Sequence, residues 1–446
     1  MAWSPDAAAL AERLTERRAV VGVVGLGYVG LPLAVEQSRA GFQVLGLDDN
    51  ADKVARVNRA ENYIPDVSSG DLVEAVAAGR LTATTRYQDL TRADVIVICV
   101  PTPLTPNKEP DLSYILAVAE RVRSVMRPGQ LVVLESTTYP GTTEEVLRPI
   151  LETSGLEVGR QMFVAFSPER VDPGNPRFHT RNTPKLVGGV TDTCGELGRL
   201  FYSQSLDQVI RVSSPAVAEM AKVFENTYRA VNIALVNEMA LLCDRMGLDV
   251  WQVLDAAGTK PFGIQIFYPG PGVGGHCIPL DPFYLAWKAR EYDFSTRFIE
   301  LAGDINLRMP YFVVDKLQAM LNEGEKSLKG ARILLLGVAY KRDSNDARES
   351  PALKVLEVLT ARGALVVYHD PKVPTVKPQA AFPRTLSAVA LTPERLRWAD
   401  AVVITTDHSD VDYGLVRRHA RLVLDTRNAL GRAPADPEAV ARVVKL

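Results

Sequence analysis

The sequence has little of what membrane, secreted or nucleic-acid-binding proteins require. No apolar run approaches the roughly 20 residues that a membrane-spanning helix needs. The N-terminal segment is charged and has no apolar core, so we expect no secretory signal peptide. The formal net charge of −2 leaves no basic excess for binding a nucleic acid. We therefore expect a cytoplasmic protein without membrane or nucleic-acid partners.

Cysteine is also scarce. The 446 residues include Cys99, Cys194, Cys243 and Cys277, whose spacing matches neither a Cys-x-x-Cys motif nor a zinc site. Scattered thiols in a long chain are typical of a reducing cytoplasm. We predict no metal centre.

In the first half of the chain, apolar β-rich runs alternate with helical patterns. The runs cover residues 20–24, 44–47, 94–100, 131–134 and 162–166. Continuous apolar runs between helices indicate parallel strands that are covered on both faces. We expect a doubly wound sheet, and the chain is long enough for two or three domains.

From Pro215 the pattern changes to one long helix. Residues 216–246 have apolar side chains at helical spacing and contain no proline or glycine, which predicts a spine between domains. After Gly324 a second α/β unit begins, with strands expected at 332–337, 365–368 and 401–404, but it keeps only Gly337 of a dinucleotide glycine turn. The predicted class is α/β, with two doubly wound Rossmann-like domains joined by a long central helix and boundaries at 1–212, 213–324 and 325–446.

A glycine turn, Gly25-Leu26-Gly27-Tyr28-Val29-Gly30, joins the first strand to a helix. Its glycines permit a tight turn and the close approach of a pyrophosphate to the helix N-terminus. Asp48 ends the next strand, where an acid binds ribose hydroxyls and repels a 2′-phosphate. A turn used only for packing is the alternative. With strand, helix and acid in register, the sequence favours an NAD site.

Cys277 follows a loop that is rich in glycine and proline. Four glycines lie between Gly270 and Gly275, and this composition suits close backbone approach to a ligand better than a core element. The alternative is a small buried hydrophobe, as most cysteines are. A thiol nucleophile beside a hydride acceptor can carry the oxidation of an alcohol beyond the aldehyde, because the thiol captures the aldehyde. His276 is either its base or a structural residue.

Other polar groups have two interpretations each. Lys222 and Asn226 share a face of the long helix, either as solvated surface or as donors to a developing oxyanion. Glu225 and Arg229 have the spacing of a surface ion pair. Residues 100–103, 136–142 and 167–174 follow strands and are rich in hydroxyl groups or proline. Glu169, in the last of these segments, is a substrate-facing carboxylate or a capping residue.

Together these motifs resemble the nucleotide-sugar 6-dehydrogenase family, which includes the UDP-glucose and GDP-mannose enzymes. The resemblance covers nearly the whole chain. It includes the Gly25 turn, Ser136-Thr137, Ser167-Pro168-Glu169, residues 222–226, the Cys277 loop with Asp281, and residues 341–350. It implies an NAD-binding domain over 1–212, a central helical domain over 213–324 that dimerises and carries the cysteine loop, and a UDP-sugar domain over 325–446.

The resemblance also implies roles for the matching residues. Cys277 is the expected nucleophile, and Lys222 and Asn226 are expected to stabilise the oxyanion. Asp281 would support Lys222 and the hydrolytic water, Thr137 would help to place that water, and Glu169 would contact the substrate and assist proton transfer. The other expected contacts are Lys53, Pro101, Thr102, Thr137 and Arg348 to NAD, and Arg170, Phe267, Tyr268, Gly272, Gly274, Gly275 and Lys341 to the nucleotide sugar.

Within the family, the chain looks most like the UDP-N-acetylhexosamine branch, through residues 169–174 and 268–272. The UDP-glucose branch has a second glutamate where Pro173 stands, and an arginine where the nearest basic residue is Lys260. The resemblance therefore implies a homodimer that oxidises C6 of UDP-N-acetyl-D-glucosamine to UDP-N-acetyl-D-glucosaminuronate with two NAD, for a surface polysaccharide. UDP-N-acetyl-D-mannosamine is the nearest alternative substrate, followed by UDP-glucose. A two-electron hydroxyacid dehydrogenase and a non-enzymatic binding protein are alternatives from other classes.

Overall fold

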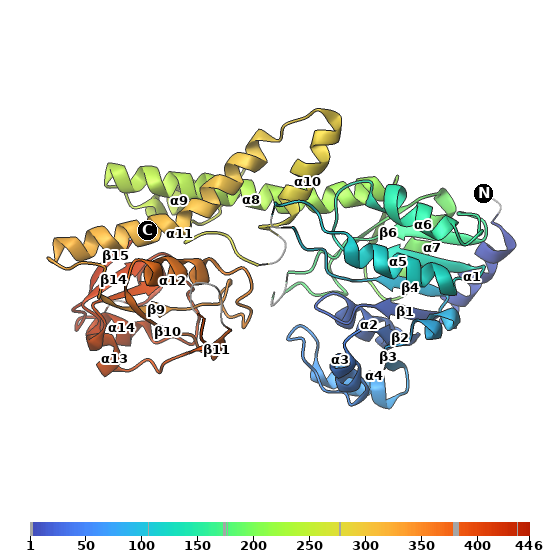
Figure 1. Ribbon diagram of the computed structural model, residues 1–446, viewed down its shortest axis with the longest axis horizontal. Coiled ribbons are helices and arrows are strands. Elements are labelled where there is room, and N and C mark those ends of the chain that lie inside the picture. Colours follow the sequence, from blue (N-terminus) through green and yellow to red (C-terminus); the bar gives the residue numbers. More distant parts are fainter. Residues whose placement is uncertain are drawn as a thin grey trace. The chain divides into compact units, whose positions relative to one another are not determined.

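The computed structural model of the chain (Figure 1) describes residues 3–105, 107–172, 175, 177–275, 278–377, 383–434 and 436–446. The chain forms two compact units. Unit 1 comprises Met1–Glu225 and Phe283–Phe294, and unit 2 comprises Asn226–Pro282 and Ser295–Leu446. The division falls inside one long helix, α8 (Pro215–Met246).

Unit 1 is built on a sheet to which the described residues contribute eight strands, in the order β3-β2-β1-β4-β5-β6-β7-β8. Neighbouring strands run parallel, except that β6 and β7 are antiparallel. The strands are β1 (Val20–Val24), β2 (Gln43–Leu47), β3 (Leu81–Thr84), β4 (Val95–Ile98), β5 (Gln130–Leu134), β6 (Met162–Phe166), β7 (Lys185–Gly189) and β8 (Val209–Val212). Because β1 lies inside the sheet and the chain winds outward on both sides of it, the topology is doubly wound.

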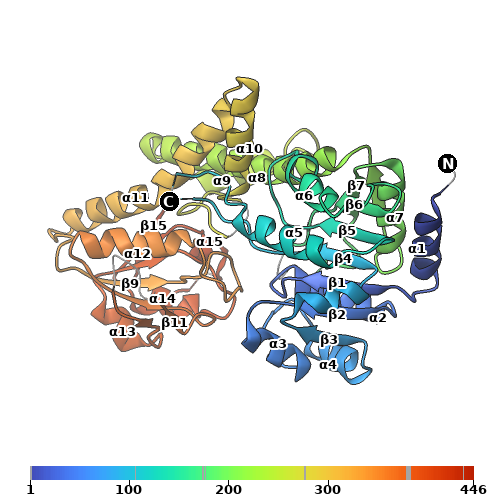
Figure 2. The ribbon, with the colours of Figure 1, turned by 45° about the vertical axis from the view of Figure 1, so that its right-hand side comes forward.

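Both faces of this sheet are covered, which explains why its strands are continuous apolar runs. Val21 and Val23 face one core with α1 (Pro5–Thr15), α2 (Gly30–Arg39) and α7 (Asp192–Tyr202). Val24 and Ile96 face the other core with α5 (Ser113–Val125) and α6 (Arg148–Glu152). Figure 2 shows α1 beside α7, and two shorter helices, α3 (Ala51–Asn58) and α4 (Ser69–Ala77), lie near β3.

Unit 2 contains a smaller sheet with the order β10-β9-β13-β14-β15, whose strand pairs are all parallel. Its strands are β9 (Arg332–Leu336), β10 (Leu365–His369), β13 (Ala401–Ile404), β14 (Leu422–Asp425) and β15 (Arg442–Lys445). In chain order this is the arrangement of β2-β1-β4-β5-β6 in unit 1. A separate antiparallel pair consists of β11 (Thr375–Val376) and β12 (Leu386–Ser387). The predicted fold class, two Rossmann-like domains with a long helix between them, is confirmed.

The helices of unit 2 cover both faces of its sheet. On one face α12 (Pro351–Ala361) and the long α11 (Arg297–Glu323) pack against Ile333 and Leu335. On the other, Leu334 and Leu336 pack with α13 (Pro393–Trp398), α14 (Tyr413–His419) and α15 (Ala429–Arg432). A further helix, α9 (Val250–Gly258), packs against the second half of α8. The remaining helix, α10 (Asp281–Ala289), follows the cysteine loop.

An aspartate joins two neighbouring strands in each sheet in the same way. In unit 1, Asp94 directly precedes β4 and accepts the backbone N–H of Val20, the first residue of β1, at 2.9 Å. In unit 2, Asp400 directly precedes β13 and accepts the N–H of Arg332, the first residue of β9, at 2.8 Å. The equivalent contacts extend the similarity between the two sheets to side chains.

Seven of the described strands were not expected from the sequence, namely β3, β7, β8, β11, β12, β14 and β15. β3 is half polar, β7 begins with the charged Lys185, and no residue of β8 is buried. β3, β8 and β15 lie at the edges of their sheets, where part of each strand stays exposed, and β11 and β12 are only two residues long. β7 and β14 are buried, but each has only a short apolar run, Leu186-Val187 and Leu422-Val423-Leu424.

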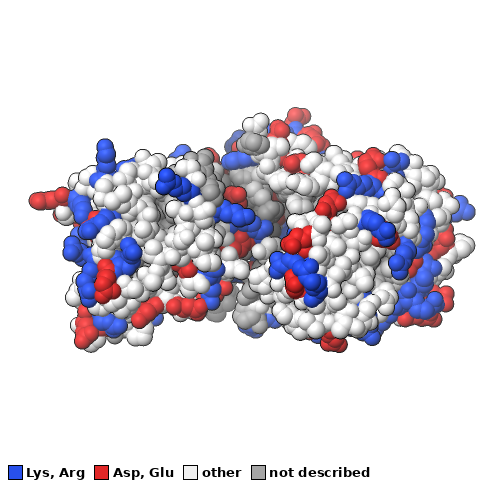
Figure 3. Space-filling view, turned by 60° about the horizontal axis from the view of Figure 1, so that its bottom comes forward, with Lys and Arg blue, Asp and Glu red and all other residues white. Residues whose placement is uncertain are grey.

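Acidic and basic side chains are interspersed on the molecular face shown in Figure 3. Such mixing agrees with the formal net charge of −2. Among the described residues, no helix is both long and apolar enough to cross a membrane.

We predict that Asp400→Asn lowers the free energy of unfolding of unit 2 by about 1.5 kcal/mol near neutral pH. Burial opposes ionisation of Asp400, but hydrogen bonds from Arg332 and Lys326 outweigh it and hold the pKa of this carboxyl below its ordinary value. A lowered folded-state pKa gives stability that is complete above the unfolded pKa of about 4 and is lost as the pH falls through the folded pKa. Urea unfolding should therefore show a difference in the free energy of unfolding between variant and wild type that becomes smaller as the pH is lowered.

The matched control for this variant is Asp315→Asn. Asp315 pairs with Arg362 at 2.6 Å, but its side chain is 62% exposed. Exposed ion pairs contribute about 0–1 kcal/mol, so this substitution should change the free energy of unfolding only slightly at every pH. Equal effects of the two substitutions at neutral pH would contradict the role assigned to Asp400.

Candidate active site

The glycine turn after β1 is packed so closely that side chains are excluded at two of its positions. Gly25 has a φ of +94°, and a Cβ there would lie 2.4 Å from the carbonyl oxygen of Cys99. A Cβ on Gly30 would lie 1.8 Å from the carbonyl oxygen of Gly25. At Gly27, by contrast, a Cβ would meet no atom of the described chain within 4 Å. The backbone is thus open at Gly27, as the approach of a pyrophosphate to the N-terminus of α2 requires.

Asp48 lies just beyond the end of β2 and is almost completely buried. Its Oδ2 accepts the N–H of Leu26 at 2.9 Å and pairs with the ammonium of Lys53 at 3.0 Å, and its Oδ1 accepts the N–H of Asn50 at 2.9 Å. The carboxylate is therefore held beside the glycine turn by one donor from that turn. The turn, Asp48 and Lys53 together fit the ribose and pyrophosphate of NAD.

The segments that follow β4 and β5 are tied to each other. The hydroxyl of Thr102 donates to the backbone carbonyl of Thr137 at 2.7 Å, and the hydroxyl of Ser136 donates to that of Val100 at 2.7 Å. The hydroxyl of Tyr284 in α10 donates to the carbonyl of Thr102. These contacts place Pro101, Thr102 and Thr137 at the carboxyl-end edge of the sheet, which also carries the glycine turn.

Glu169 follows β6 at the same edge. Its Oε1 accepts the N–H groups of Arg170 and Val171, both at 2.7 Å, and its Oε2 lies 3.4 Å from the ammonium of Lys185. Lys185 also pairs with Glu135 at 3.1 Å, and Glu135 accepts a hydrogen bond from the hydroxyl of Tyr202. Burial alone would raise the pKa of Glu169, but Lys185 and the two amides outweigh it and lower that pKa.

Lys222 is almost completely buried on α8, one helical turn before Asn226. Its positive charge helps to lower the pKa of Glu169, after the larger contributions of burial, Lys185 and Val171. Within the described residues its ammonium has no hydrogen-bond or ion-pair partner. A buried ammonium without a carboxylate partner is costly unless a ligand or another group compensates it.

The expected surface ion pair of Glu225 with Arg229 is wrong. Glu225 instead pairs with Arg170 at 2.6 Å, and Arg229 donates to the side-chain oxygen of Asn226. The spacing on one helix was right for a pair, but the segment after β6 brings a closer cation to Glu225. Arg170 also donates to the carbonyl of Pro184 at 2.7 Å, so its guanidinium is held by the chain itself.

Asn226 is fully buried, and its amide nitrogen donates to the carboxylate of Asp281 at the start of α10. Asp281 is itself almost completely buried. The structure therefore brings Asn226 and Asp281 together in unit 2. Cys277 and His276 lie outside the described residues, as do Pro173 and Gly174.

The glycines of the loop before Cys277 pack against the second sheet's domain within unit 2. A Cβ on Gly272, whose φ is +133°, would lie 3.0 Å from Pro351, and one on Gly274 would lie 2.7 Å from the same proline. A Cβ on Gly275 would lie 3.0 Å from the ring of Tyr340. The loop runs too close to its neighbours for side chains, which accounts for its composition.

The aromatic residues expected to line the sugar pocket have partners in unit 2. Tyr268 stacks on Trp251 with the ring centroids 5.4 Å apart, and its hydroxyl donates to Asp255 at 2.7 Å. Phe267 contacts Tyr228 edge to face, at 5.9 Å between centroids.

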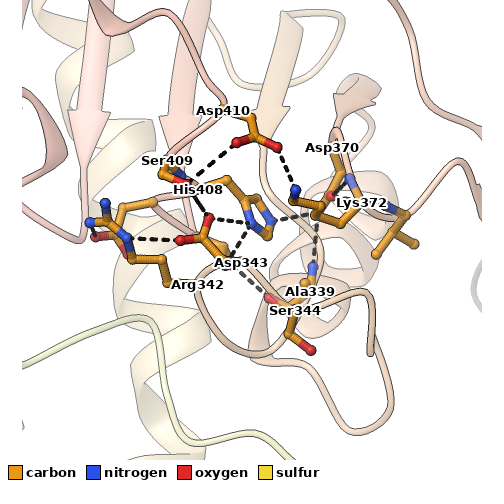
Figure 4. A network of polar contacts seen from close by, with 12 residues as sticks. Ala339, Arg342, Asp343, Ser344, Asp370, Lys372, His408, Ser409 and Asp410 are labelled. Carbon is orange, nitrogen blue, oxygen red and sulfur yellow. Dashed lines mark hydrogen bonds and ion pairs between the residues drawn. The ribbon is translucent and has the colours of Figure 1, made fainter. Parts of the chain in front are cut away.

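The segment with Lys341 and Arg348 is a loop that follows the second glycine turn. Figure 4 shows that His408 lies between this loop and Asp370: its Nδ1 accepts the N–H of Asp343 at 3.0 Å, so its Nε2 donates to Asp370 at 3.1 Å. Within the loop, Arg348 pairs with Asp346 at 2.6 Å and Ser344 donates to the carbonyl of Lys341 at 3.3 Å. The loop is therefore held in place from outside by His408.

Asp370 is the counterpart of Asp48 in the second sheet, but it has more partners. Its Oδ2 accepts the N–H groups of Val338 and Ala339, and its Oδ1 accepts those of Lys372 and Val373. Burial raises the pKa of Asp370, while the bond from His408 and these amides lower it below its ordinary value. The chain's own donors occupy the carboxylate that binds ribose in a dinucleotide domain.

Sequence reasoning missed Lys185, Glu135 and Tyr202. Lys185 opens a strand whose other residues are apolar or glycine, and a charged residue in such a strand is the feature that points to it. Glu135 directly follows the apolar run of β5 and precedes Ser136-Thr137. Neither spacing shows that these residues meet, because the antiparallel direction of β7 is what brings them together.

Three segments of the chain match models of one family. Residues 19–206 match the NAD binding domain of the UDP-glucose/GDP-mannose dehydrogenase family, residues 216–308 its central domain, and residues 334–432 its UDP binding domain. These matches confirm the family resemblance and the prediction of NAD as the cofactor.

Several proteins that are similar to this chain are named as dehydrogenases of UDP-N-acetyl sugars. The UDP-N-acetyl-D-glucosamine 6-dehydrogenase of Pseudomonas aeruginosa is 38% identical over 79% of this chain and 82% of its own. The UDP-N-acetyl-D-mannosamine dehydrogenase of Pyrococcus horikoshii is 36% identical over 93% of this chain and 96% of its own. A solved structure of UDP-D-ManNAc dehydrogenase from Pyrococcus horikoshii superimposes with a TM-score of 0.85 at 34% identity, covering 95% of this chain and 98% of that one.

We predict that Gly27→Ala weakens NAD binding by ~10-fold or more while leaving the unfolding temperature unchanged. The added methyl group meets no atom of the described residues within 4 Å, so the fold tolerates it, but it occupies the space in which the pyrophosphate approaches the backbone. Calorimetric titration with NAD and a thermal melt give the two measurements. Gly30→Ala is the contrasting variant, because its methyl group collides with the Gly25 carbonyl and should lower stability itself. Unchanged NAD affinity in Gly27→Ala would contradict the site.

Proposed function

Because the chain belongs to the UDP-glucose/GDP-mannose dehydrogenase family, we propose that it oxidises C6 of UDP-N-acetyl-D-glucosamine to give UDP-N-acetyl-D-glucosaminuronate. It is an NAD-dependent nucleotide-sugar dehydrogenase. The observation that carries the proposal is the hydrogen bond of Asn226 with Asp281, which stands four residues after Cys277. It joins the long helix to the cysteine loop in a chain that also has a dinucleotide turn.

The chemistry proposed for Cys277 explains why a dehydrogenase has a thiol. The C6 alcohol is oxidised to an aldehyde, the thiolate of Cys277 adds to it as a thiohemiacetal, and a second oxidation gives a thioester. Water then displaces the thiolate and supplies the second oxygen of the carboxylate. When bound, NAD supplies the hydride acceptor for each of the two oxidations.

We assign supporting roles to the polar residues that would act together with that thiol. The ammonium of Lys222 and the amide of Asn226 stabilise the negative oxygen of the tetrahedral species, and buried donors are effective for this. Asp281 orients Asn226 and assists the hydrolytic water, which Thr137 helps to place. Glu169, ionised and held by two backbone amides, contacts the substrate and accepts a proton.

The remaining assignments concern residues that are proposed to contact the nucleotide sugar or the cofactor. Lys341 is proposed to contact the uridine diphosphate, and Arg348 to contact the cofactor. Arg170, Phe267, Tyr268 and the backbone at Gly272, Gly274 and Gly275 are proposed to contact the nucleotide sugar, with Arg170 acting from its pair with Glu225. In this assignment residues 1–212 bind NAD, 213–324 form the central domain and 325–446 bind the UDP moiety.

We propose a homodimer that works in the cytoplasm for surface polysaccharide synthesis. Support for the dimer comes from exposed apolar side chains on α8, which recur three, four or seven residues apart. These are Val217, Met220, Phe224, Tyr228, Leu235, Leu242 and Met246. A helix stripe of this kind suits another copy of the same helix.

UDP-N-acetyl-D-mannosamine is the second candidate substrate. A relative of nearly full coverage and a closely superimposing structure both carry that name. The two sugars differ only in configuration at C2, which leaves the chemistry at C6 identical. UDP-glucose ranks third, since it lacks the N-acetyl group.

With limiting UDP-N-acetyl-D-glucosamine and excess NAD, we expect two NADH for every sugar consumed and no free aldehyde. The thiol retains the aldehyde carbon until the second oxidation, so the reaction passes four electrons. Absorbance of NADH and quantification of the uronate product give the ratio. A ratio of one would contradict the thioester and would favour a two-electron hydroxyacid type of dehydrogenase.

Substrate identity is tested by comparing kcat/KM for three UDP-sugars under the same conditions. We expect UDP-N-acetyl-D-glucosamine to exceed UDP-N-acetyl-D-mannosamine by ~10-fold, which corresponds to about 1.4 kcal/mol in transition-state binding, and UDP-glucose to be poorer still. A preference for the manno sugar would reassign the substrate while leaving the chemistry intact.

A further inference from the structure

Lys185 occupies an unusual place for a lysine. It is the first residue of β7, its side chain is only 5% exposed, and its ammonium lies between the carboxylates of Glu135 and Glu169 at 3.1 and 3.4 Å. The ammonium also faces the ring of Tyr202, 5.3 Å from the centroid. Buried lysines are rare unless they are paired, so this position needs an explanation.

The direction of β7 explains how Lys185 reaches Glu169. β7 is antiparallel to β6, with Phe166 opposite Gly188, so the first residue of β7 lies beside the segment that follows β6. The hydroxyl of Ser167, which donates to the carbonyl of Leu186 at 2.7 Å, extends the pairing in that direction. A parallel β7 would place Lys185 at the opposite edge of the sheet, away from every group proposed to react.

The two carboxylates around Lys185 are not equivalent. Glu135 has a fully buried side chain, and its Oε2 has no hydrogen-bond partner among the described residues. Burial raises the pKa of Glu135, and Lys185 offsets this rise only in part. Glu169 is 18% exposed, accepts two backbone amides, and has a lowered pKa. Of the two acids, Glu169 is the one that stays ionised and open to a ligand.

The other charged and titratable groups that face this cluster come from separate elements. Lys222 on α8 adds a positive charge near Glu169. Tyr202 on α7 donates to Glu135, and the thiol of Cys99, just after β4, has a pKa that burial and then Glu135 raise. Arg170 directs its guanidinium to Glu225 instead. Among the described residues Lys185 is therefore the cation closest to Glu169, and the burial of both carboxylates makes its charge effective.

We propose that Lys185, backed by Glu135, is a positioning residue that keeps Glu169 ionised and fixes the direction of its carboxylate toward the substrate. This role rests on the proposed function of Glu169 in proton transfer. Lys185 acts on one oxygen of Glu169 while the amides of Arg170 and Val171 hold the other. Each carboxylate oxygen accepts more than one hydrogen bond, so the held carboxylate still has capacity for a substrate hydroxyl or water.

The test compares the pH dependence of kcat/KM in Lys185→Met and wild type, using NADH formation from UDP-N-acetyl-D-glucosamine. Removal of an adjacent opposite charge moves a carboxyl pKa upward by about 1–3 units. Because the pKa of Glu169 is lowered in the wild type, a shift near the middle of this range should make the ratio of variant to wild type fall ~3-fold or more between about pH 8 and pH 5. A purely structural ion pair would lower the ratio equally at every pH, and that outcome would overturn the proposal.

Lys288→Met is the matched control. Lys288 in α10 also has a side chain that is only 5% exposed, and it also pairs with two glutamates, Glu145 and Glu291, both at 2.6 Å. It should give a ratio independent of pH, because neither glutamate takes part in the proposed reaction. Lys185→Arg keeps the charge and should restore the wild-type pH dependence.

If Lys185→Met fails to fold, the double variant Glu135→Gln with Lys185→Met provides the same test. It removes the second buried acid together with the lysine, so no uncompensated pair of carboxylates remains. The ratio of its kcat/KM to that of the wild type should show the same fall as the pH is lowered, because Glu169 still lacks its cation. A wild type that yields no NADH with any UDP-sugar would instead refute the proposed function, whereas an active wild type with pH-independent ratios would refute only the role of Lys185.

Discussion

A lysine buried between two carboxylates holds together three strand ends at one edge of the sheet in unit 1. Glu135 follows β5, Glu169 follows β6 and Lys185 begins β7, so one ion cluster joins three consecutive strands. The cost of desolvating a buried ion pair is offset only when further hydrogen bonds satisfy the charges. Here the hydroxyl of Tyr202 and the two amides after Glu169 donate those hydrogen bonds. The polar segments after β4 and β5, with Thr102 and Thr137, are tied to each other at the same edge.

The two Rossmann-like sheets show how one architecture serves two purposes. Asp48 accepts a single amide from its glycine turn and pairs with Lys53, and Gly27 leaves the backbone open. Asp370 is saturated by four backbone amides and by His408, which also holds the loop containing Lys341. The same carboxylate position thus lies beside the proposed NAD site in the first sheet and is saturated by the chain's own donors in the second.

The elements that could be predicted from the sequence are those determined by neighbouring residues in the chain. Central strands such as β1, β4 and β6 are apolar because both faces are buried, and the glycine turn is recognisable because Gly25 and Gly30 exclude side chains. The Lys185 cluster was not predictable in that way. Its members, Glu135, Glu169 and Lys185, follow one another at separations of 34 and 16 residues along the chain. The reversed direction of β7 is what brings Lys185 beside the two glutamates. The pair of Glu225 with Arg170 is likewise a contact between residues 55 positions apart, where helix spacing had favoured Arg229.

The central claim is that Cys277 carries the sugar as an acyl group between the two oxidations. Its most direct measurement is acid quenching within the first turnover of UDP-N-acetyl-D-glucosamine and NAD, followed by mass spectrometry of the peptide that contains Cys277. The account predicts the added mass of the UDP-sugar acyl group on Cys277, and loss of that mass when hydroxylamine is present, with a sugar hydroxamate as product. Normal turnover with an unmodified Cys277 at every quench time, or a modification on Cys99, Cys194 or Cys243 instead, would contradict it.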